Sequence, residues 1–411
     1  MGQLHIETDP AEVGLDADRL ARIDRHFQRY VDDGRLPGWL ISIARHGKVA
    51  HLSMAGQRDI ESGAAVDADT IWRIYSMTKP LTAVAALTLW EQGAFELRDP
   101  VSKYIPAFAQ TKVWRSGSTT NPMLEPMREP MQLWHLLSHT SGLTYGFMNA
   151  HPVDAMYRQA GFEWGVPADA DLAAICDRLA ALPLVFQPGT EWNYSMGLDV
   201  LGRVIEVITG QRFDEHLSTA VLQPLGMHDT AWSVAAADTG RLAALYGVHP
   251  ATGSAMRLEA FGNAALTPPA AHLGGGGLVS TAYDYHRFTQ MLINEGELDG
   301  VRVLSPSSVR YMASNHLPGG VDLATFGRPL FSEGAFDGVG FGLGVSVTID
   351  PVAGKVPGSV GEFAWGGAAS TAFWVDPVED MTVQFFTQLL PSSSHPIRSQ
   401  LKQLVYQAII D

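Results

Sequence analysis

The sequence predicts an α/β fold of the α+β kind, with an antiparallel sheet from both chain ends flanked by helices and a mainly helical domain inserted in the middle. Short β-rich runs gather near both termini, amphipathic helical patterns lie close to each end, and helical periodicity dominates the middle. We therefore expect a sheet domain at residues 1–100 and 275–411 and a helical domain at residues 101–274. The active site is expected in the cleft between them.

The N-terminal elements are expected to be a helix and a hairpin. Residues 16–33 place apolar side chains at helical spacing and end before Gly34. Residues 39–45 and 49–54 are β-rich runs joined by a short Gly-containing turn, which suits adjacent antiparallel strands. Near the C-terminus the same reasoning predicts strands at residues 341–349, 361–365, 371–375 and 381–387, and a last helix at 399–410. The Gly- and Pro-rich residues 117–130 are expected to be a long connection.

Composition excludes several classes of function. The formal net charge is -15, whereas phosphate-backbone binding needs clustered Lys and Arg, so no nucleic-acid partner is expected. The single cysteine, Cys176, cannot form an internal disulfide and is expected to be buried. No apolar run approaches the roughly 20 residues of a membrane span, and the polar N-terminus lacks a secretory pattern. We expect a cytoplasmic protein without a membrane partner, and the oligomeric state stays open.

The first candidate for chemistry is Ser76 with Lys79, just before the apolar run 81–90. Pro80 is best tolerated in the first turn of a helix, so the helix is expected to begin close to Ser76. Residues three apart on a helix face the same side, so the hydroxyl and the amine can touch. Burial disfavours the charged form of a lysine, and a neutral lysine can deprotonate a serine.

Two more segments are candidates for the same site. Tyr194 stands at the start of a helical pattern, where its hydroxyl could shuttle protons, although its position also fits a packing tyrosine. In the segment Trp365-Gly366-Gly367-Ala368, paired glycines would permit close approach of a ligand, and the amide of Ala368 could donate to an oxyanion. A glycine bulge is the alternative interpretation.

Three other patterns are interpreted as structural. The Ser-x-x-Lys spacing recurs at Ser399 and Lys402, on a polar stripe of the last helix that is expected to be solvated surface. His135 and His139 have the spacing of a zinc site but lack the glutamate of a metalloprotease, so neither a metal nor another cofactor is expected. The glycine run 274–277 lacks the Lys-Ser/Thr of a phosphate loop.

Together these segments resemble the family VIII carboxylesterases, the esterase branch of the fold shared with class C β-lactamases and serine penicillin-binding proteins. The resemblance covers most of the chain and implies a β-lactamase/transpeptidase-like fold. It rests on three motifs and two supporting segments: Ser-Met-Thr-Lys at 76–79, Tyr194, Trp-Gly-Gly at 365–367, residues 135–143 and residues 274–280.

The resemblance also implies a division of roles. Ser76 would attack the carbonyl of a small-molecule ester, and Lys79 and Tyr194 would transfer the protons. The amides of Ser76 and Ala368 would form the oxyanion hole. The residues expected to line the substrate pocket are Trp365, Gly366, Gly367, Tyr145 and Phe147.

Two departures from the β-lactamase pattern favour an ester substrate. Tyr194-Ser195-Met196 replaces Tyr-x-Asn, which removes a group that would recognise an amide. Trp365-Gly366-Gly367 replaces Lys-Thr-Gly, which removes the grip on a carboxylate. We therefore predict a serine carboxylesterase for small or medium acyl esters. A β-lactamase, an amidase or D-aminopeptidase, an acyltransferase, and a non-catalytic binding protein stay open as alternatives.

Overall fold

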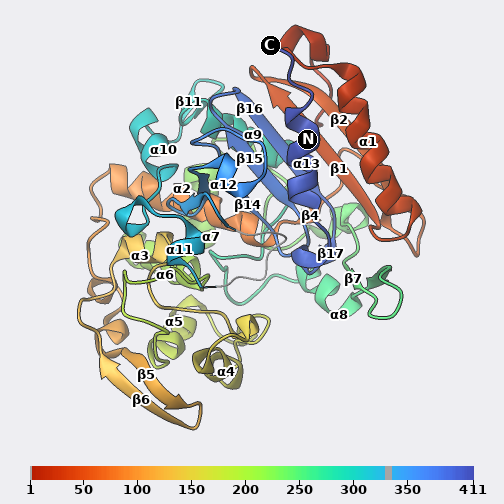
Figure 1. Cartoon of the computed structure of the whole chain (residues 1–411). Helices are drawn as coiled ribbons and strands as arrows, with labels where there is room; N and C mark the ends of the chain where they lie inside the picture. Colours follow the sequence, from red (N-terminus) through yellow and green to blue (C-terminus); the bar gives the residue numbers. More distant parts are fainter. Residues whose placement is uncertain (1, 329–335) are drawn as a thin grey trace.

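The computed structural model describes residues 2–328 and 336–411, and its centre is one antiparallel sheet built from both ends of the chain (Figure 1). The strand order is β12-β13-β14-β15-β16-β1-β2-β3, so the first strand of the chain pairs with a strand near its end, and Leu40 lies opposite Phe386. The predicted fold class is thereby confirmed. The strands are β1 (Gly38–Arg45), β2 (Lys48–Asp59), β3 (Ala64–Ala65), β12 (Val339–Phe341), β13 (Ser346–Thr348), β14 (Phe363–Gly366), β15 (Ala372–Asp376) and β16 (Met381–Phe386).

Helices cover both faces of this sheet. Helices α1 (Ala17–Asp32) and α13 (Ile397–Tyr406) pack on one face, and α2 (Thr78–Glu91) and α9 (Ala282–Ile293) lie in the core on the other. Side chains alternate between the two faces of a strand, so Ile41 of β1 enters the first core and Leu40 enters the second. Because both faces are covered, every residue of β1 is buried.

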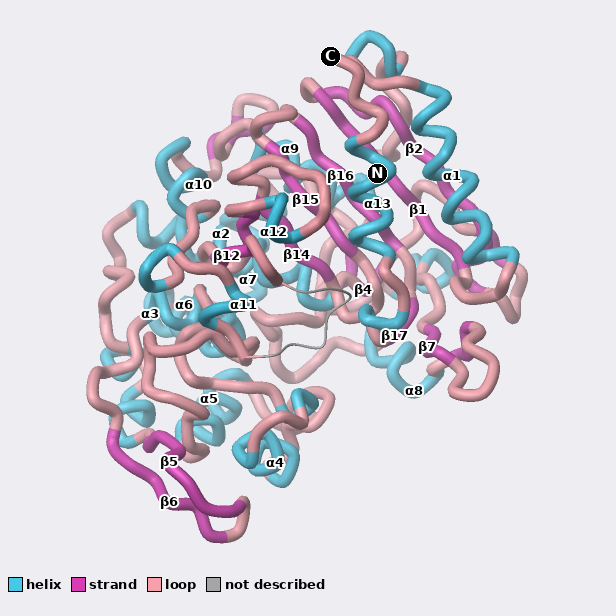
Figure 2. Tube along the Cα trace, viewed as in Figure 1, coloured by secondary structure: helices cyan, strands magenta, loops and turns pink. Residues whose placement is uncertain are grey.

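Residues 101–274 are mainly helical, as predicted, and Figure 2 shows their helices beside the sheet. One core of buried side chains runs from Leu81 of α2 to Leu201 of α6, so this segment packs directly against the sheet part. The division into domains at residues 100 and 275 stays a prediction. The helices here are α3 (Leu133–Leu137), α4 (Pro152–Gln159), α5 (Leu172–Ala180), α6 (Gly197–Thr209), α7 (Phe213–Leu217) and α8 (Glu259–Gly262).

Short elements complete the described part of the chain. Strand β17 (Leu389–Leu390) pairs with the hairpin β7 (Tyr246–Val248) and β8 (Ala255–Arg257), and β4 (Trp72–Arg73) pairs with β9 (Val279–Ser280). The remaining elements are β10 (Glu297–Leu298), β11 (Val301–Arg302), α10 (Pro306–Met312), α11 (Leu323–Phe326) and α12 (Pro351–Gly354). Cys176 is buried in α5, as predicted. Among the described residues, none of the helices has the length and apolarity that crossing a bilayer takes.

The structure corrects the prediction of a connection at residues 117–130. Most of that segment belongs to a hairpin of β5 (Lys112–Ser118) and β6 (Asn121–Pro126). Pro122 and Pro126 suggested a loop, but β6 is an edge strand of a two-stranded sheet, where a missing backbone donor is tolerated.

The single strand predicted at residues 341–349 is also wrong. The chain reverses there, and β12 and β13 pair with each other across the turn. Gly344 adopts a φ of +84°, and the Gly342 amide donates to the Val345 carbonyl at 2.8 Å. Only glycine takes such a φ without strain, so this turn interrupts an otherwise continuous β-rich run.

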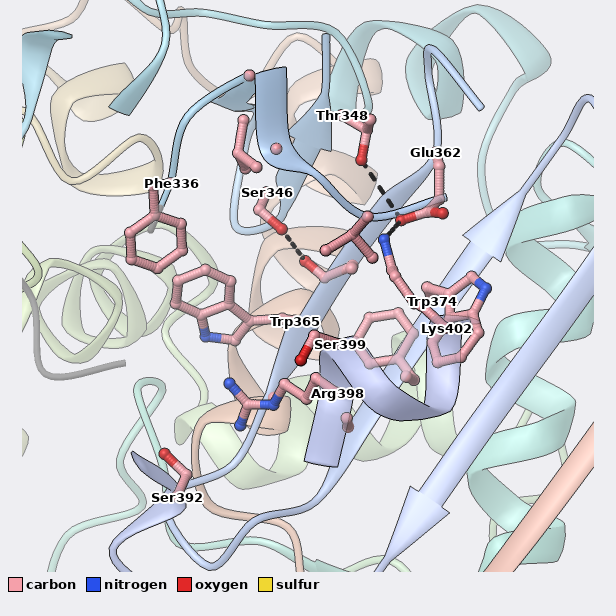
Figure 3. Close-up of a pocket in the computed structure, with 18 of the residues that line it drawn as sticks. Phe336, Ser346, Thr348, Glu362, Trp365, Trp374, Ser392, Arg398, Ser399 and Lys402 are labelled. Carbon is pink, nitrogen blue, oxygen red and sulfur yellow. Dashed lines mark hydrogen bonds and ion pairs between the residues drawn. The ribbon is translucent and has the colours of Figure 1, made fainter. Parts of the chain in front are cut away.

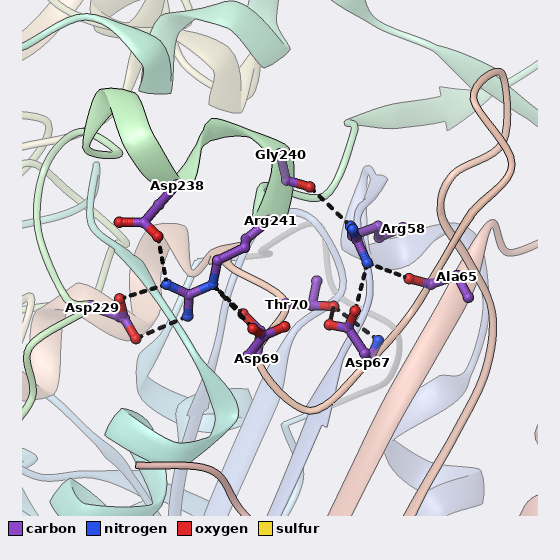
Figure 4. Close-up of polar contacts among 9 residues, drawn as sticks. All are labelled: Arg58, Ala65, Asp67, Asp69, Thr70, Asp229, Asp238, Gly240 and Arg241. Carbon is purple, nitrogen blue, oxygen red and sulfur yellow. Dashed lines mark hydrogen bonds and ion pairs between the residues drawn. The ribbon is translucent and has the colours of Figure 1, made fainter. Parts of the chain in front are cut away.

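Two arginines fix the chain just before the turn that carries Ser76 (Figure 4). Arg58 of β2 donates to Asp67 at 2.6 Å. Arg241 makes two hydrogen bonds of 2.9 Å to Asp229 and another of 3.1 Å to the carbonyl of Asp69. Asp67 and Asp69 lie shortly before β4, so these contacts fix the segment of chain that leads through β4 to the turn of Ser76.

Phe385 tests the core between the sheet and α1. Its side chain is fully buried, and its ring lies 5.2 Å from that of Phe27. We expect Phe385→Ala to lower the free energy of unfolding by about 3–5 kcal/mol, because it leaves a cavity in a packed core. Urea unfolding followed by circular dichroism measures this change. Val378→Ala, at a position that is 68% exposed, is the control and should change stability by about 0.5 kcal/mol or less. Equal effects of the two variants would contradict the assigned core.

Candidate active site

Ser76 lies in a tight turn immediately before α2. Residues Tyr75–Met77 form one 3-10 turn and α2 follows directly, so the helix begins close to Ser76, as predicted. Tyr75 has a φ of +43°, which is uncommon for a bulky residue and turns the chain sharply in front of the serine. The hydroxyl of Tyr285 donates to the Met77 carbonyl at 3.0 Å and holds the turn from the α9 side.

Arg73 anchors the strand that leads into this turn. Its buried guanidinium donates to the carbonyl of Ala243 at 2.6 Å, to the side chain of Gln388 at 3.2 Å and to the carbonyl of Gly262. Burial lowers the pKa of Arg73 to about 10, so the group is still a cation at neutral pH. Three segments are thus tied to the chain three residues before Ser76.

The three residues predicted to be catalytic meet at the serine hydroxyl. Tyr194 Oη donates to Ser76 Oγ at 2.6 Å, and Lys79 Nζ donates to the same oxygen at 3.3 Å. The lysine nitrogen also lies 4.5 Å from the centre of the Tyr194 ring. Lys79 is fully buried, whereas Ser76 is partly exposed and lines a cavity. Two segments more than 100 residues apart therefore bring a hydroxyl, an amine and a phenol into contact.

Lys79 has two further acceptors. Its Nζ donates to the Gly275 carbonyl at 2.6 Å and to the hydroxyl of Tyr145 at 3.1 Å. Burial, followed by the charge of Asp199, holds the pKa of Tyr145 well above its usual range, so this phenol is neutral. Tyr145 was predicted to line the pocket, and the structure places its hydroxyl on the lysine instead. Its ring stacks on Phe147 with centres 4.7 Å apart, and Phe147 is the one of the two that lines the cavity.

The sequence interpretation missed Asp199 as a neighbour of this site, and it named the segment that contains Gly275 without giving that glycine a role. Asp199, in the first turn of α6, is buried, and its Oδ1 accepts from the Gly275 amide at 2.8 Å. A side chain on Gly275 would come within 2.7 Å of the Asp199 carboxylate and 2.9 Å of the Tyr145 hydroxyl. The available signal was an acidic residue five positions after Tyr194, within a strongly apolar helix, together with the glycine run.

The Trp-Gly-Gly segment forms the end of β14 beside Ser76. A side chain on Gly367 would collide with the Ile74 carbonyl, and one on Gly366 would collide with Arg398. The close approach that the paired glycines permit is therefore made by the protein's own chain. Ala368 follows on the cavity wall, as does Ser76. The oxyanion-hole role of the Ala368 amide stays a prediction.

A cavity of about 270 Å³ opens beside Ser76. Figure 3 shows part of its wall, including Trp365. Ser76, Tyr194 and Phe147 line it, together with Trp365 and the backbone of β14. The ring of Trp365 lies 5.5 Å from that of Tyr194 and 5.2 Å from that of Phe341, which fixes this aromatic wall. Phe336 lines the cavity too. From the sequence we also expect the loop 326–338 to shape the pocket, but residues 329–335 of that loop lie outside the described residues.

The second Ser-x-x-Lys pair corrects another prediction. Ser399 and Lys402 were interpreted as solvated surface, yet both are partly buried and line the cavity (Figure 3). The polar stripe of α13 faces the end of β14 because the opposite stripe fills the core under α1. Lys402 pairs with the buried Glu362, and Ser399 donates to the Pro396 carbonyl at 3.2 Å.

His135 and His139 have separate roles. His135 Nδ1 accepts from the Gln132 amide at 2.9 Å and caps α3. His139 Nδ1 lies 3.0 Å from the hydroxyl of Ser195, and its ring lies 4.8 Å from that of Tyr194. Burial, and then the charge of Lys79, lowers the pKa of His139 well below its usual range, so this ring is neutral packing beside Tyr194.

Comparison with known proteins agrees with this geometry. Residues 23–407 match the family model described as Beta-lactamase. Esterase EstB of Burkholderia gladioli is 32% identical over 97% of this chain and 98% of its own length. Protein Rv1367c of Mycobacterium tuberculosis is 37% identical over 88% of each chain.

A solved structure of a hydrolase has the same fold as this chain. EstCE1, described as a hydrolase with promiscuous acyltransferase activity, superposes with a TM-score of 0.79 at 27% identity, over 95% of this chain and 99% of its own. The chain therefore belongs to the β-lactamase family, as its motifs predicted, and is a serine hydrolase.

Proposed function

We propose that this chain is a serine carboxylesterase that hydrolyses small or medium acyl esters through an acyl-enzyme on Ser76. The observation that carries the proposal is the contact of Ser76 Oγ with both Tyr194 Oη, at 2.6 Å, and Lys79 Nζ, at 3.3 Å. A serine hydroxyl is a weak nucleophile until a neighbouring base accepts its proton, and a nitrogen and a phenol at these distances meet that need.

To act as the base, Lys79 must be neutral when it accepts the Ser76 proton. Its two N–H groups would donate to the Gly275 carbonyl and the Tyr145 hydroxyl, and its lone pair would accept the Ser76 proton. The hydroxyl of Tyr194 would donate to Ser76 Oγ. Every donor and acceptor of the group would then have a partner, and the serine proton would point at its base.

In acylation, Ser76 Oγ bonds to the ester carbonyl carbon while its proton passes to Lys79. The carbonyl oxygen becomes an oxyanion, for which we propose the amides of Ser76 and Ala368 as donors. Collapse of this intermediate breaks the bond to the alcohol oxygen, which takes a proton from Tyr194, and Lys79 returns a proton to the phenol. Water then attacks the acyl-enzyme, and the same groups accept its proton and return one to Ser76 Oγ.

Several features support an uncharged ester as the substrate. The wall beside Ser76 is aromatic, with Trp365 where the β-lactamase motif carries a cation. Lys402, farther along the cavity, pairs with Glu362, and Arg398 donates to the carbonyls of Gly367 and Thr371 at 3.3 Å. The charge of Lys402 is already paired with Glu362, so a substrate carboxylate would gain little from it.

Acyl transfer is the second candidate function. EstCE1, similar to this chain over nearly its whole length, is described as having promiscuous acyltransferase activity. The acyl-enzyme step is common to both reactions, and only the acceptor differs: water for hydrolysis, an alcohol for transfer. An apolar wall beside Ser76 favours an organic alcohol over water at that position.

The first test removes the proposed groups one at a time. We expect Ser76→Ala to abolish hydrolysis of p-nitrophenyl butyrate, because it removes the oxygen proposed to carry the acyl group. Tyr194→Phe should lower kcat by roughly 10²- to 10⁴-fold, the usual value of a positioned proton-transfer group. Steady-state kinetics measures both. Ser308→Ala on α10, whose hydroxyl contacts Ser305, is the control and should keep wild-type rates. Undiminished turnover by Ser76→Ala would refute the proposal.

The second test compares substrate classes. We expect kcat/KM for p-nitrophenyl butyrate to exceed that for a chromogenic cephalosporin on the order of 10²-fold, because the chain lacks the groups that would bind the amide and the carboxylate. Both reactions are followed by absorbance with one enzyme preparation. Faster turnover of the cephalosporin would identify a β-lactamase that uses the same serine.

The third test measures partition between acceptors. With p-nitrophenyl butyrate and increasing 1-butanol, we expect butyl butyrate to form at a rate that rises with the alcohol concentration. Chromatography separates this ester from butyric acid, and Ser76→Ala corrects for the uncatalysed reaction. Production of butyric acid alone at every alcohol concentration would exclude acyl transfer and leave hydrolysis as the function.

A further inference from the structure

The glycine run 274–277 joins α2 to α6 behind the catalytic group. Thr82 of α2 donates to the Gly274 carbonyl at 2.7 Å, and a side chain on Gly274 would collide with the Leu198 carbonyl of α6. The next residue, Gly275, uses its carbonyl for Lys79 and its amide for Asp199. The run therefore packs between α2, which carries Lys79, and α6, which carries Asp199, and it sets the distance between these two helices.

Asp199 and Tyr194 reach the site from the same short segment. Tyr194 stands in the loop before α6, and Asp199 is in the first turn of that helix. One end of this segment contacts Ser76, and the other contacts Lys79 through Gly275. A shift of α6 would therefore move the phenol and the support of the lysine together.

The Asp199 carboxylate is an isolated buried charge apart from Lys79. Burial raises the pKa of Asp199 above its usual value, and the charge of Lys79 and the Gly275 amide hydrogen bond offset part of that increase. Backbone donors and a nearby cation both favour the ionised carboxylate. Such a group in a core carries a cost, which is offset while its charge has a partner, and Lys79 becomes that cation, on the other side of Gly275, when it accepts the Ser76 proton.

We propose that Asp199 is a positioning residue that fixes Lys79 through both backbone groups of Gly275 and supplies the buried counter-charge that sets how readily the lysine releases its proton. This inference rests on the proposed function, in which Lys79 must be neutral to accept the Ser76 proton. Asp199 touches neither the serine nor the cavity wall. It acts through the lysine.

Several titratable side chains surround Asp199 and Lys79, and three of them are neutral, so they do not compete with Asp199 for the charge of the lysine. They come from four segments: Tyr145 and His139 after α3, Tyr194 before α6, Cys176 on α5 and Lys79 on α2. Burial raises the pKa of the Cys176 thiol and the Tyr145 phenol and lowers that of His139. All three are therefore neutral around pH 7.

The Asp199→Asn variant removes the carboxylate charge but keeps the shape of the side chain, so it should change the pH dependence of kcat/KM in one direction. Asn at position 199 still offers an oxygen to the Gly275 amide but no longer stabilises an ammonium at Lys79. The lysine then loses its proton at lower pH, so the acid limb of kcat/KM should move down by about one pH unit. A less basic amine is also a weaker general base, so the plateau should fall about tenfold.

The test is the pH profile of kcat/KM for p-nitrophenyl butyrate in the wild type and Asp199→Asn, together with the rate of Ser76 labelling by a fluorophosphonate. Asp154→Asn is the matched control. That carboxylate is equally buried, but it accepts from Thr144 and from the amides of Ala150 and His151. It should lower the melting temperature and leave the midpoint of the acid limb unchanged.

The outcomes separate the two proposals. A wild type that neither turns over the ester nor is labelled would overturn the proposed function and this inference with it. An active wild type whose midpoint is unchanged in Asp199→Asn would overturn the role of Asp199 alone, as would an equal shift in Asp154→Asn.

If the Asp199→Asn variant does not fold, Asp199→Glu replaces it. It keeps the charge, so its midpoint should stay within about 0.3 pH unit of the wild type, and a shift of a full unit would contradict the proposal.

Discussion

The packing of the segments around the active site depends on one buried lysine amine, which needs hydrogen-bond partners from the protein because water does not reach it. Lys79 is fully buried, and an unpaired amine at such a depth would destabilise the fold. Its nitrogen finds the Gly275 carbonyl, the Tyr145 hydroxyl and the Ser76 hydroxyl, each supplied by a different segment. The structural requirement and the chemical one coincide here, because the partners that permit burial also aim the amine at the serine.

The sheet contributes by holding the serine still. The end of β14 packs against the turn that carries Ser76, at a distance that leaves no room for a side chain on Gly367. Behind it, β15 and β16 join the C-terminal part of the chain to β1 from the N-terminal part. The nucleophile therefore sits between a rigid sheet edge and the helical segment that delivers Tyr194, and the cavity opens along that edge.

The sequence was sufficient wherever local spacing decides the outcome. The three-residue spacing of Ser76 and Lys79 on a helix predicts their contact, and two β-rich runs joined by a short Gly-containing turn predict the hairpin of β1 and β2. The meeting of Tyr194 with Ser76 followed only from the family resemblance, because it depends on how α6 packs against α2. The prolines of β6 suggested a loop because prolines are rare in strands, but β6 is an edge strand, where they are tolerated. The strand expected at residues 341–349 is instead two short strands joined by a glycine-containing turn. Asp199 was missed because an acidic residue in a helix usually faces solvent.

The most direct test of the central claim is mass spectrometry of the protein trapped with an alkyl fluorophosphonate. The account predicts one adduct per chain, on the peptide that contains Ser76, and none in Ser76→Ala. An adduct on Ser399, the serine of the other Ser-x-x-Lys pair on the cavity wall, or an unmodified protein under conditions that inactivate the enzyme, would contradict it.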